Sequence, residues 1–211
     1  MSELAFQKAI QHHQQGDIKN AQRLYMEVLR DEPQHALALR NLGLIALETG
    51  HIDDAIDLYQ RAMRIRSDVA SWKSELAQVY SRAGDGIAAK NQLLSALRIE
   101  PQNSLFLYLL GNLYTDLGQM PEAIQAYRNA IRINPAQARV YSALSHLAAT
   151  GDYKFTPEEQ KQLQHQANNP HLSADDLSHI HFALANLSQR KKQLDKAFDH
   201  FQRATKLKKE A

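Results

Sequence analysis

Four glycines stand at a constant interval of 34 residues, at Gly16, Gly50, Gly84 and Gly118. A fixed period of this length is typical of a repeat protein, in which each repeat is one small supersecondary unit. One such repeat cannot bury its apolar face by itself, so neighbouring repeats have to stack. The period therefore predicts a stacked array for the 211-residue chain, rather than one or two globular domains.

Other positions follow the same period when Gly16 is placed at position 15 of the repeat. Position 20 is alanine in four successive repeats: Ala21, Ala55, Ala89 and Ala123. Position 27 is small or β-branched: Val28, Ala62, Ala96 and Ala130. Position 24 is large: Tyr25, Tyr59, Leu93 and Tyr127. Each repeat thus contains two apolar patterns with a period near 3.6, separated by a glycine turn, which predicts a helix hairpin closely packed through its small residues.

The fourth repeat carries the fullest pattern: Leu107, Leu110, Gly111, Tyr114, Ala123, Tyr127 and Pro135. This pattern resembles the tetratricopeptide repeat (TPR) family. The resemblance implies an all-α fold, a right-handed superhelical solenoid of about six helix-turn-helix repeats that form a single array over residues 1–211. We expect the repeats at 2–35, 36–69, 70–103, 104–137, 138–177 and 178–211, the last being a C-terminal capping repeat.

The fifth repeat is degenerate and contains an insertion at 152–172. After Gly151, Pro157 stands at position 20 and Gln164 at position 27. Thr156 followed by Pro157 and, three residues on, Glu159 predicts a new helix with a capping box, ending near residue 167. Ser173 then caps a further helix.

The segment from 151 to 208 resembles the TPR region of bacterial proteins in which such an array precedes a sulfotransferase domain. The shared segments are Phe155-Thr156, Glu158-Glu159, Leu172–Asp176, His181–Leu184 and Ala197–Phe201. This resemblance implies that the array is a regulatory or substrate-presenting arm of a sulfotransferase. The phosphate-binding loop of that enzyme is absent from this sequence.

In TPR arrays, helix A residues line a concave groove, and the resemblance implies a peptide or partner-protein ligand there. Mapped onto this chain, the expected partner-binding residues are Phe6, Arg40, Leu44, Leu47, Gln78, Arg82, Tyr108 and Asn112. Exposed apolar side chains would anchor an extended peptide, while arginine and asparagine would orient it, with arginine pairing bidentately with carboxylates.

We find no sequence motif for catalysis, for cofactor binding or for metal binding. Cysteine is absent, which removes thiol chemistry and Cys-ligated zinc. The ten histidines show no i, i+4 pair and no HExxH motif, so we expect surface histidines. Gly84-Asp85-Gly86 lacks the third glycine of a dinucleotide-binding loop. We therefore expect a non-enzymatic protein with no catalytic residues, no cofactor and no metal site.

Charge and hydropathy exclude two further classes of partner. Residues 187–211 contain eight Lys and Arg against three Asp and Glu, but no aromatic residues interleave the terminal lysines. We read this segment as a solvated capping helix and expect no nucleic acid. The longest apolar run, Leu105–Leu110, is too short to span a bilayer, so we expect no membrane insertion and a cytoplasmic location.

Three functions remain open from the sequence. The first is a protein-interaction scaffold, the second is the arm of a sulfotransferase whose catalytic domain lies outside this chain, and the third is a self-assembling oligomer.

Overall fold

The computed structural model describes residues 2–211, and these residues form twelve α-helices and no strand. Helix contacts group into two compact units, 1–101 and 102–211, called the N-terminal and C-terminal units below. The N-terminal unit contains α1 (Ser2–Gln14), α2 (Ile18–Asp31), α3 (Ala36–Glu48), α4 (Ile52–Ile65), α5 (Ala70–Arg82) and α6 (Gly86–Ile99). The C-terminal unit contains α7 (Ser104–Asp116), α8 (Met120–Ile133), α9 (Ala138–Thr150), α10 (Pro157–Gln166), α11 (Ala174–Arg190) and α12 (Leu194–Glu210).

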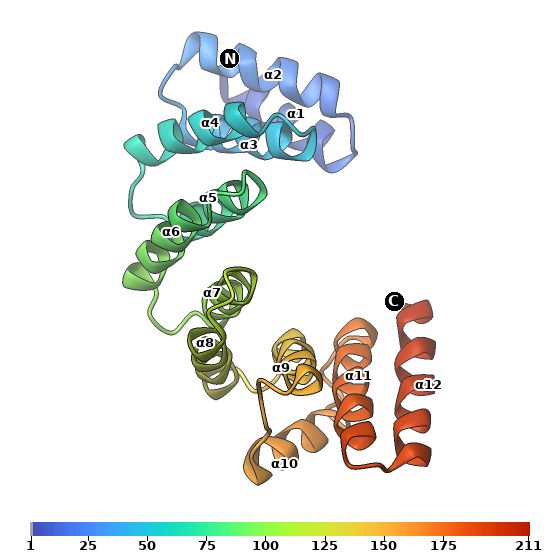
Figure 1. Ribbon diagram of the computed structural model, residues 1–211. Coiled ribbons are helices and arrows are strands. Elements are labelled where there is room, and N and C mark those ends of the chain that lie inside the picture. Colours follow the sequence, from blue (N-terminus) through green and yellow to red (C-terminus); the bar gives the residue numbers. More distant parts are fainter. Residues whose placement is uncertain (1) are drawn as a thin grey trace. The chain divides into compact units, whose positions relative to one another are not determined.

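The N-terminal unit consists of three helix hairpins, α1 with α2, α3 with α4, and α5 with α6 (Figure 1). In each hairpin the first helix, helix A, has 13 residues and the second, helix B, has 14. The periodic glycines make the turns, for example Gly16 at φ 75° and Gly50 at φ 82°. Glycine suits this left-handed conformation because it has no Cβ to clash with the backbone.

Small residues bring the two helices of a hairpin together, as the period predicts. Ala55 and Ala62 on α4 are completely buried, and Tyr59 between them is buried as well. A Cβ placed on Gly43 of α3 would lie 3.0 Å from the Tyr59 ring, and one on Gly111 of α7 would lie 2.5 Å from the Tyr127 ring. The tyrosine rings therefore occupy space that any larger residue at these glycines would fill.

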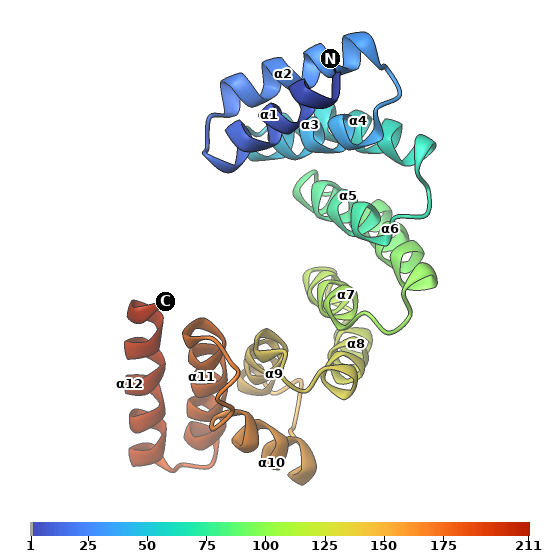
Figure 2. The same ribbon diagram turned by 180° about the vertical axis from the view of Figure 1, so that it is seen from behind.

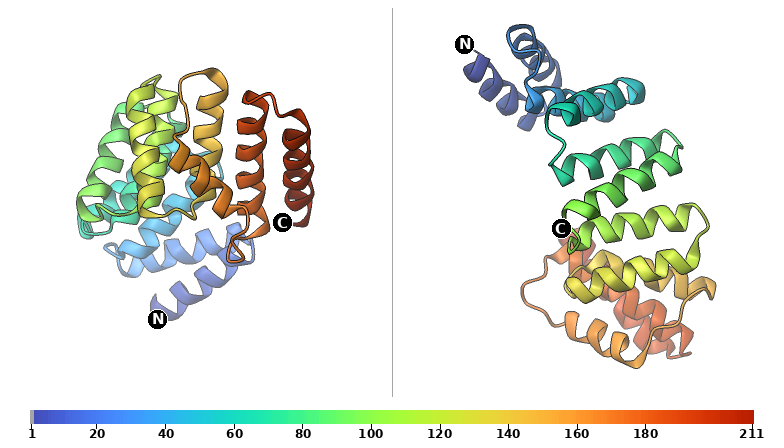
Figure 3. Two further views of the ribbon diagram at one scale, coloured as in Figure 1. Left: turned by 90° about the horizontal axis from the view of Figure 1, so that it is seen from below. Right: turned by 90° about the vertical axis from the view of Figure 1, so that its left-hand side faces the viewer.

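The C-terminal unit starts with a regular hairpin, α7 with α8, and then departs from the pattern. Helix α9 packs directly against α11, and α11 packs in turn against α12 (Figure 3). The ten-residue α10 runs in a different direction below α9 and α11 (Figure 2). Thr156 and Glu159 form the predicted capping box of α10. Helix α11 begins at Ala174, capped by Ser173, so the expected repeat boundary at 177/178 falls inside a helix.

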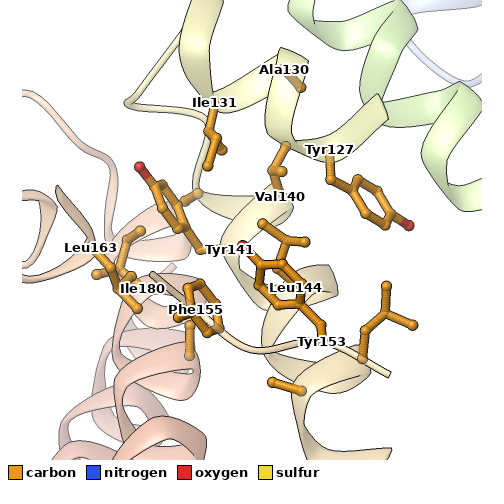
Figure 4. Close-up of a cluster of buried hydrophobic side chains, with 14 of the residues drawn as sticks. Tyr127, Ala130, Ile131, Val140, Tyr141, Leu144, Tyr153, Phe155, Leu163 and Ile180 are labelled. Carbon is orange, nitrogen blue, oxygen red and sulfur yellow. The ribbon is translucent and has the colours of Figure 1, made fainter. Parts of the chain in front are cut away.

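A large apolar cluster joins the irregular helices of this unit. Tyr141 and Leu144 of α9, Leu163 of α10 and Ile180 of α11 are fully buried in it. Phe155, from the segment that precedes α10, lies beside Leu163 and Ile180 (Figure 4). The insertion is therefore anchored by its own apolar residues. Every helix within residues 2–211 is too short or too polar to span a lipid bilayer.

Candidate partner-binding site

Polar contacts connect successive A helices of the N-terminal unit at a separation of 35 residues. His13 Nε2 of α1 lies 3.5 Å from Glu48 Oε2 of α3. Arg40 of α3 pairs with Glu75 of α5, and Arg82 Nη1 of α5 donates to the carbonyl oxygen of Leu47 at 3.3 Å. We call the surface of α1, α3 and α5 that carries these contacts the helix A face. It comprises Ile10, His13, Arg40, Leu44, Glu48, Glu75, Gln78 and Arg82.

Arg40 is engaged inside the protein. Its Nε donates to Glu75 Oε2 at 2.8 Å, its Nη2 to Glu75 Oε1 at 2.5 Å, and its Nη1 to Asn41 Oδ1 at 3.0 Å. The hydrogen bonds to Glu75 raise the pKa of the Arg40 guanidinium despite its partial burial. Arg40 links α3 to α5 through this bidentate pair with Glu75. Because the two nitrogens are already occupied, Arg40 is not free to bind a ligand carboxylate, contrary to the expectation.

The expectation of exposed anchors is wrong for Phe6 and Leu47, which are 5% and 9% exposed. The Phe6 ring packs 5.8 Å from the Tyr25 ring and 4.5 Å from the His35 ring, centroid to centroid. Leu47 belongs to the apolar cluster that contains Tyr59. Both side chains point into the packing between helices, and their contribution is to the core.

Three expected residues of the N-terminal unit remain accessible. Leu44 is half-buried, whereas Gln78 and Arg82 are exposed. The Gln78 amide makes one long contact, 3.5 Å, to the carbonyl oxygen of Ser74. Arg82 donates from one nitrogen to the Leu47 carbonyl near the C-terminal end of α3, where the helix dipole favours a cation. The rest of its guanidinium faces solvent.

The other two expected residues, Tyr108 and Asn112, lie on α7 of the C-terminal unit and are half-buried. Asn112 Oδ1 accepts a hydrogen bond of 2.7 Å from the Tyr127 hydroxyl, and the Tyr108 ring lies 6.3 Å from the Tyr127 ring. Burial raises the pKa of Tyr127 to about 12, so its hydroxyl stays protonated and donates. Asn112 thus holds a core tyrosine with its carbonyl and keeps its amide nitrogen for other contacts. The eight expected residues form two separate sets, one in each unit.

A groove that the sequence did not predict lies on helices α2, α3 and α4. It has a volume of about 560 Å³. Its apolar lining comprises Met26, Leu29, Leu42, Ile45, Ala46 and Leu58, and its charged lining comprises Arg30, Asp54, Asp57 and Arg61. The sequence feature that could have indicated this groove is Met26, an apolar residue that is exposed and lies one helical turn from Gln22 and from Arg30.

The expectation of surface histidines is also wrong at one place. His181 of α11 is only 7% exposed, and its Nδ1 lies 3.0 Å from Nδ1 of His200 on α12. The two residues are 19 positions apart, so neither helical spacing nor a motif relates them. Among residues 2–211, no group of three or more His, Cys, Asp or Glu is placed to hold a metal ion.

Models of the tetratricopeptide repeat family match residues 6–70, 93–125 and 111–147. This chain is a tetratricopeptide repeat protein. The TPR chain is 24% identical over 181 residues to human protein O-mannosyl-transferase TMTC3, covering 84% of the chain and 19% of that protein. It is 30% identical over 155 residues to cellulose synthase 2 operon protein C of Komagataeibacter xylinus, covering 70% of the chain and 12% of that protein. It therefore spans a fifth or less of the length of these relatives.

Solved structures confirm the all-α TPR fold. The pilF protein of Pseudomonas aeruginosa superimposes with a TM-score of 0.74 at 17% identity, covering 94% of this chain and 88% of that one. Cut9, from the Cut9–Hcn1 hetero-tetramer of the APC/C, gives 0.70 at 20% identity, covering 98% of this chain and 40% of that chain. MamA gives 0.62 at 19% identity, covering 99% and 92%. At these identities the likeness establishes the fold alone.

Proposed function

We propose that this TPR protein is a non-catalytic scaffold that binds a peptide or partner protein on the helix A face of its N-terminal unit. The observation that carries the proposal is the arrangement of Leu44, Gln78 and Arg82. They stay accessible on two neighbouring A helices that Arg40 and Glu75 hold together. A surface fixed before binding loses little conformational entropy when the ligand arrives.

The three accessible side chains suit an extended peptide. Leu44 offers an apolar contact, the Gln78 amide can pair with a peptide group, and the free nitrogens of Arg82 can bind a carboxylate or a carbonyl. Tyr108 and Asn112 offer an aromatic ring and an amide on the C-terminal unit, as a second contact region. Cut9, which shares the fold, assembles with Hcn1, and this supports a role in assembly.

The test is a peptide selection followed by affinity measurements. A displayed library of random extended peptides is selected against the whole chain, and binding of the best peptide is measured by calorimetry. We expect Gln78→Ala with Arg82→Ala to weaken binding about tenfold or more, because arginine is among the residues that dominate interface energies. The matched control is Met26→Ala with Arg30→Ala on the α2–α3–α4 groove, which should change the affinity less than about twofold.

Two outcomes of the affinity measurements would contradict the proposal. If the groove variant loses binding and the helix A variant keeps it, the partner site is the α2–α3–α4 groove. If neither matters for any selected peptide, the N-terminal unit is not the binding region.

The sulfotransferase arm is the alternative function, and its support is the likeness of residues 151–208 to those fusion proteins. Sequencing the gene beyond Ala211 tests the fused form directly, since an immediate stop codon defeats it. Self-assembly is the third possibility, and sedimentation that shows a monomer mass independent of concentration would defeat it.

A further inference from the structure

A small pocket in the C-terminal unit is lined by α10, α11 and α12, with a volume of about 280 Å³. Its ionisable lining residues are His181, Lys191, Lys196, His200 and Arg203. Its neutral polar lining comprises Gln164, Asn168, Ser188 and Gln193, and no carboxylate is among the lining residues. A recess with three cations and no acid attracts anions, because the cations repel one another when it is empty.

Two histidines from neighbouring helices line this pocket, His181 of α11, which is buried, and His200 of α12, which is half-buried. His181 and His200 face each other with ring centroids 5.2 Å apart and an interplanar angle of 30°. The 3.0 Å contact between their Nδ1 atoms requires one ring to donate and the other to accept. Addition of one proton leaves this hydrogen bond intact, since the charged ring can still donate. A second proton would turn both Nδ1 atoms into donors and break it.

The charges around the pair decide its protonation. Burial lowers the pKa of both imidazoles, and the pKa of His181 is lowered further by His200 and Arg203. Lys191, which directly follows α11, and Lys196 of α12 add positive charge, while Gln164 of α10 and Asn168, which follows α10, are neutral. Asp199, which neighbours His200 on α12, acts in the opposite direction. A bound anion would offset this positive surplus and favour a protonated ring.

We propose that this pocket binds a tetrahedral oxyanion, either inorganic phosphate or the phosphate of a phosphomonoester. Arg203 can take two oxygens through its planar guanidinium, Lys196 supplies a point charge, and the amides of Gln164 and Asn168 add neutral donors. The volume lies below that of a drug-sized ligand site, which fits one anionic group and its water. Binding of a metal cation is disfavoured, because the pocket offers only two imidazole ligands and its three positively charged side chains would repel the metal. This site is independent of the helix A face, which belongs to the other unit.

Sulfate is the first probe, because it stays a dianion across the pH range tested. The ring signals of His181 and His200, assigned with the His181→Gln and His200→Gln variants, are followed by NMR during titration with sodium sulfate at constant ionic strength. We expect saturable shifts of both rings and binding about tenfold tighter at pH 5.5 than at pH 7.5, because protonation and anion binding are linked. Arg203→Gln should weaken sulfate binding about tenfold, through loss of a charge-assisted contact.

The matched control is Lys209→Gln, which removes the same charge from α12 outside the pocket. It should leave the affinity within about twofold of the parent. Equal weakening by both variants would mean a diffuse basic surface and overturn the proposal, as would rings that respond to zinc but not to sulfate. Titrations with phosphate and with phosphoserine identify the source: tighter binding of phosphoserine indicates a phosphorylated side chain, and equal binding indicates the free ion. Failure of sulfate, phosphate and phosphoserine alike to shift the rings also overturns it.

Discussion

Helices α3 and α9 both begin at position 1 of a repeat, but α3 packs against the next helix in the chain, α4, whereas α9 does not pack closely against α10. On α4, Ala55, Tyr59 and Ala62 are all completely buried against neighbouring helices. On α10, Pro157 and Gln164 stand at the corresponding alanine positions and are exposed, and α9 packs against α11 instead. Helix α10, which lacks the small–large–small pattern, therefore does not form a hairpin with α9. Where that pattern is lost, Leu163, Tyr153 and Phe155 supply a substitute core.

Replacing Tyr59 by alanine gives the largest expected effect. The ring fills the interface of α3, α4 and α5, so its loss should cost about 4 kcal/mol of unfolding free energy through lost burial and a cavity. Urea unfolding followed by circular dichroism measures the change. Because regular hairpins share this core, hydrogen exchange should speed up in α3, α4 and α5 together. Faster exchange in α4 alone would contradict a shared core.

Replacing Leu163 by alanine should cost about 3 kcal/mol, but locally. Leu163 is completely buried and is the large apolar anchor of α10. Hydrogen exchange should therefore show release of α10, while α11 and α12 keep their protection, since local regions can open separately. Loss of protection in α12 as well would show that α10 is an integral part of the repeat packing.

Gly111→Ala and Gly43→Ala form a matched pair across the two units. The added methyl group on residue 111 would lie 2.5 Å from the Tyr127 ring, against 3.0 Å from the Tyr59 ring for residue 43. We expect Gly111→Ala to destabilise by about 2 kcal/mol through overpacking. The smaller clash at Gly43 is largely offset by the better helix propensity of alanine, about 1 kcal/mol. Equal unfolding midpoints for the two variants would refute this difference.

Acid should destabilise the C-terminal unit. Burial lowers the pKa of His179, His181 and His200, so between those lowered values and about pH 6.5 the unfolded chain binds more protons than the folded one. Stability is therefore full above pH 6.5 and falls as the pH decreases through this window. Melting temperatures at pH 7.5 and 5.5 measure it. His200→Gln should reduce the pH dependence, whereas the control His146→Gln, at an exposed position, should not. Equal pH dependence in both variants would contradict the explanation.

The sequence predicts those features that local chemistry determines. The glycine turns, the helix hairpins of the regular repeats, the capping box of Thr156 and Glu159 and the Ser173 cap each depend on residues a few positions apart. The position of Arg40 opposite Glu75 depends on how two hairpins stack, and the sequence of either helix alone does not determine that stacking. Phe6 is buried because α2 and His35 cover it, and the pairing of His181 with His200 arises from the packing of α11 on α12.

The accessibility of the expected partner-binding residues is therefore the least predictable feature. The helix A rule selected Leu44, Gln78 and Arg82, which are accessible, but it also selected Phe6 and Leu47, which are buried. Periodicity identifies which side of a helix a residue occupies. Its accessibility depends on side chains from the next hairpin.

The proposed contact of a peptide ligand with the helix A face can be tested by hydrogen–deuterium exchange of the whole chain with and without a selected peptide. We expect slower exchange in α3 and α5 on peptide binding, with α2 and α4 unchanged. Slower exchange in α2 and α4, with α5 unaffected, would instead place the ligand in the α2–α3–α4 groove.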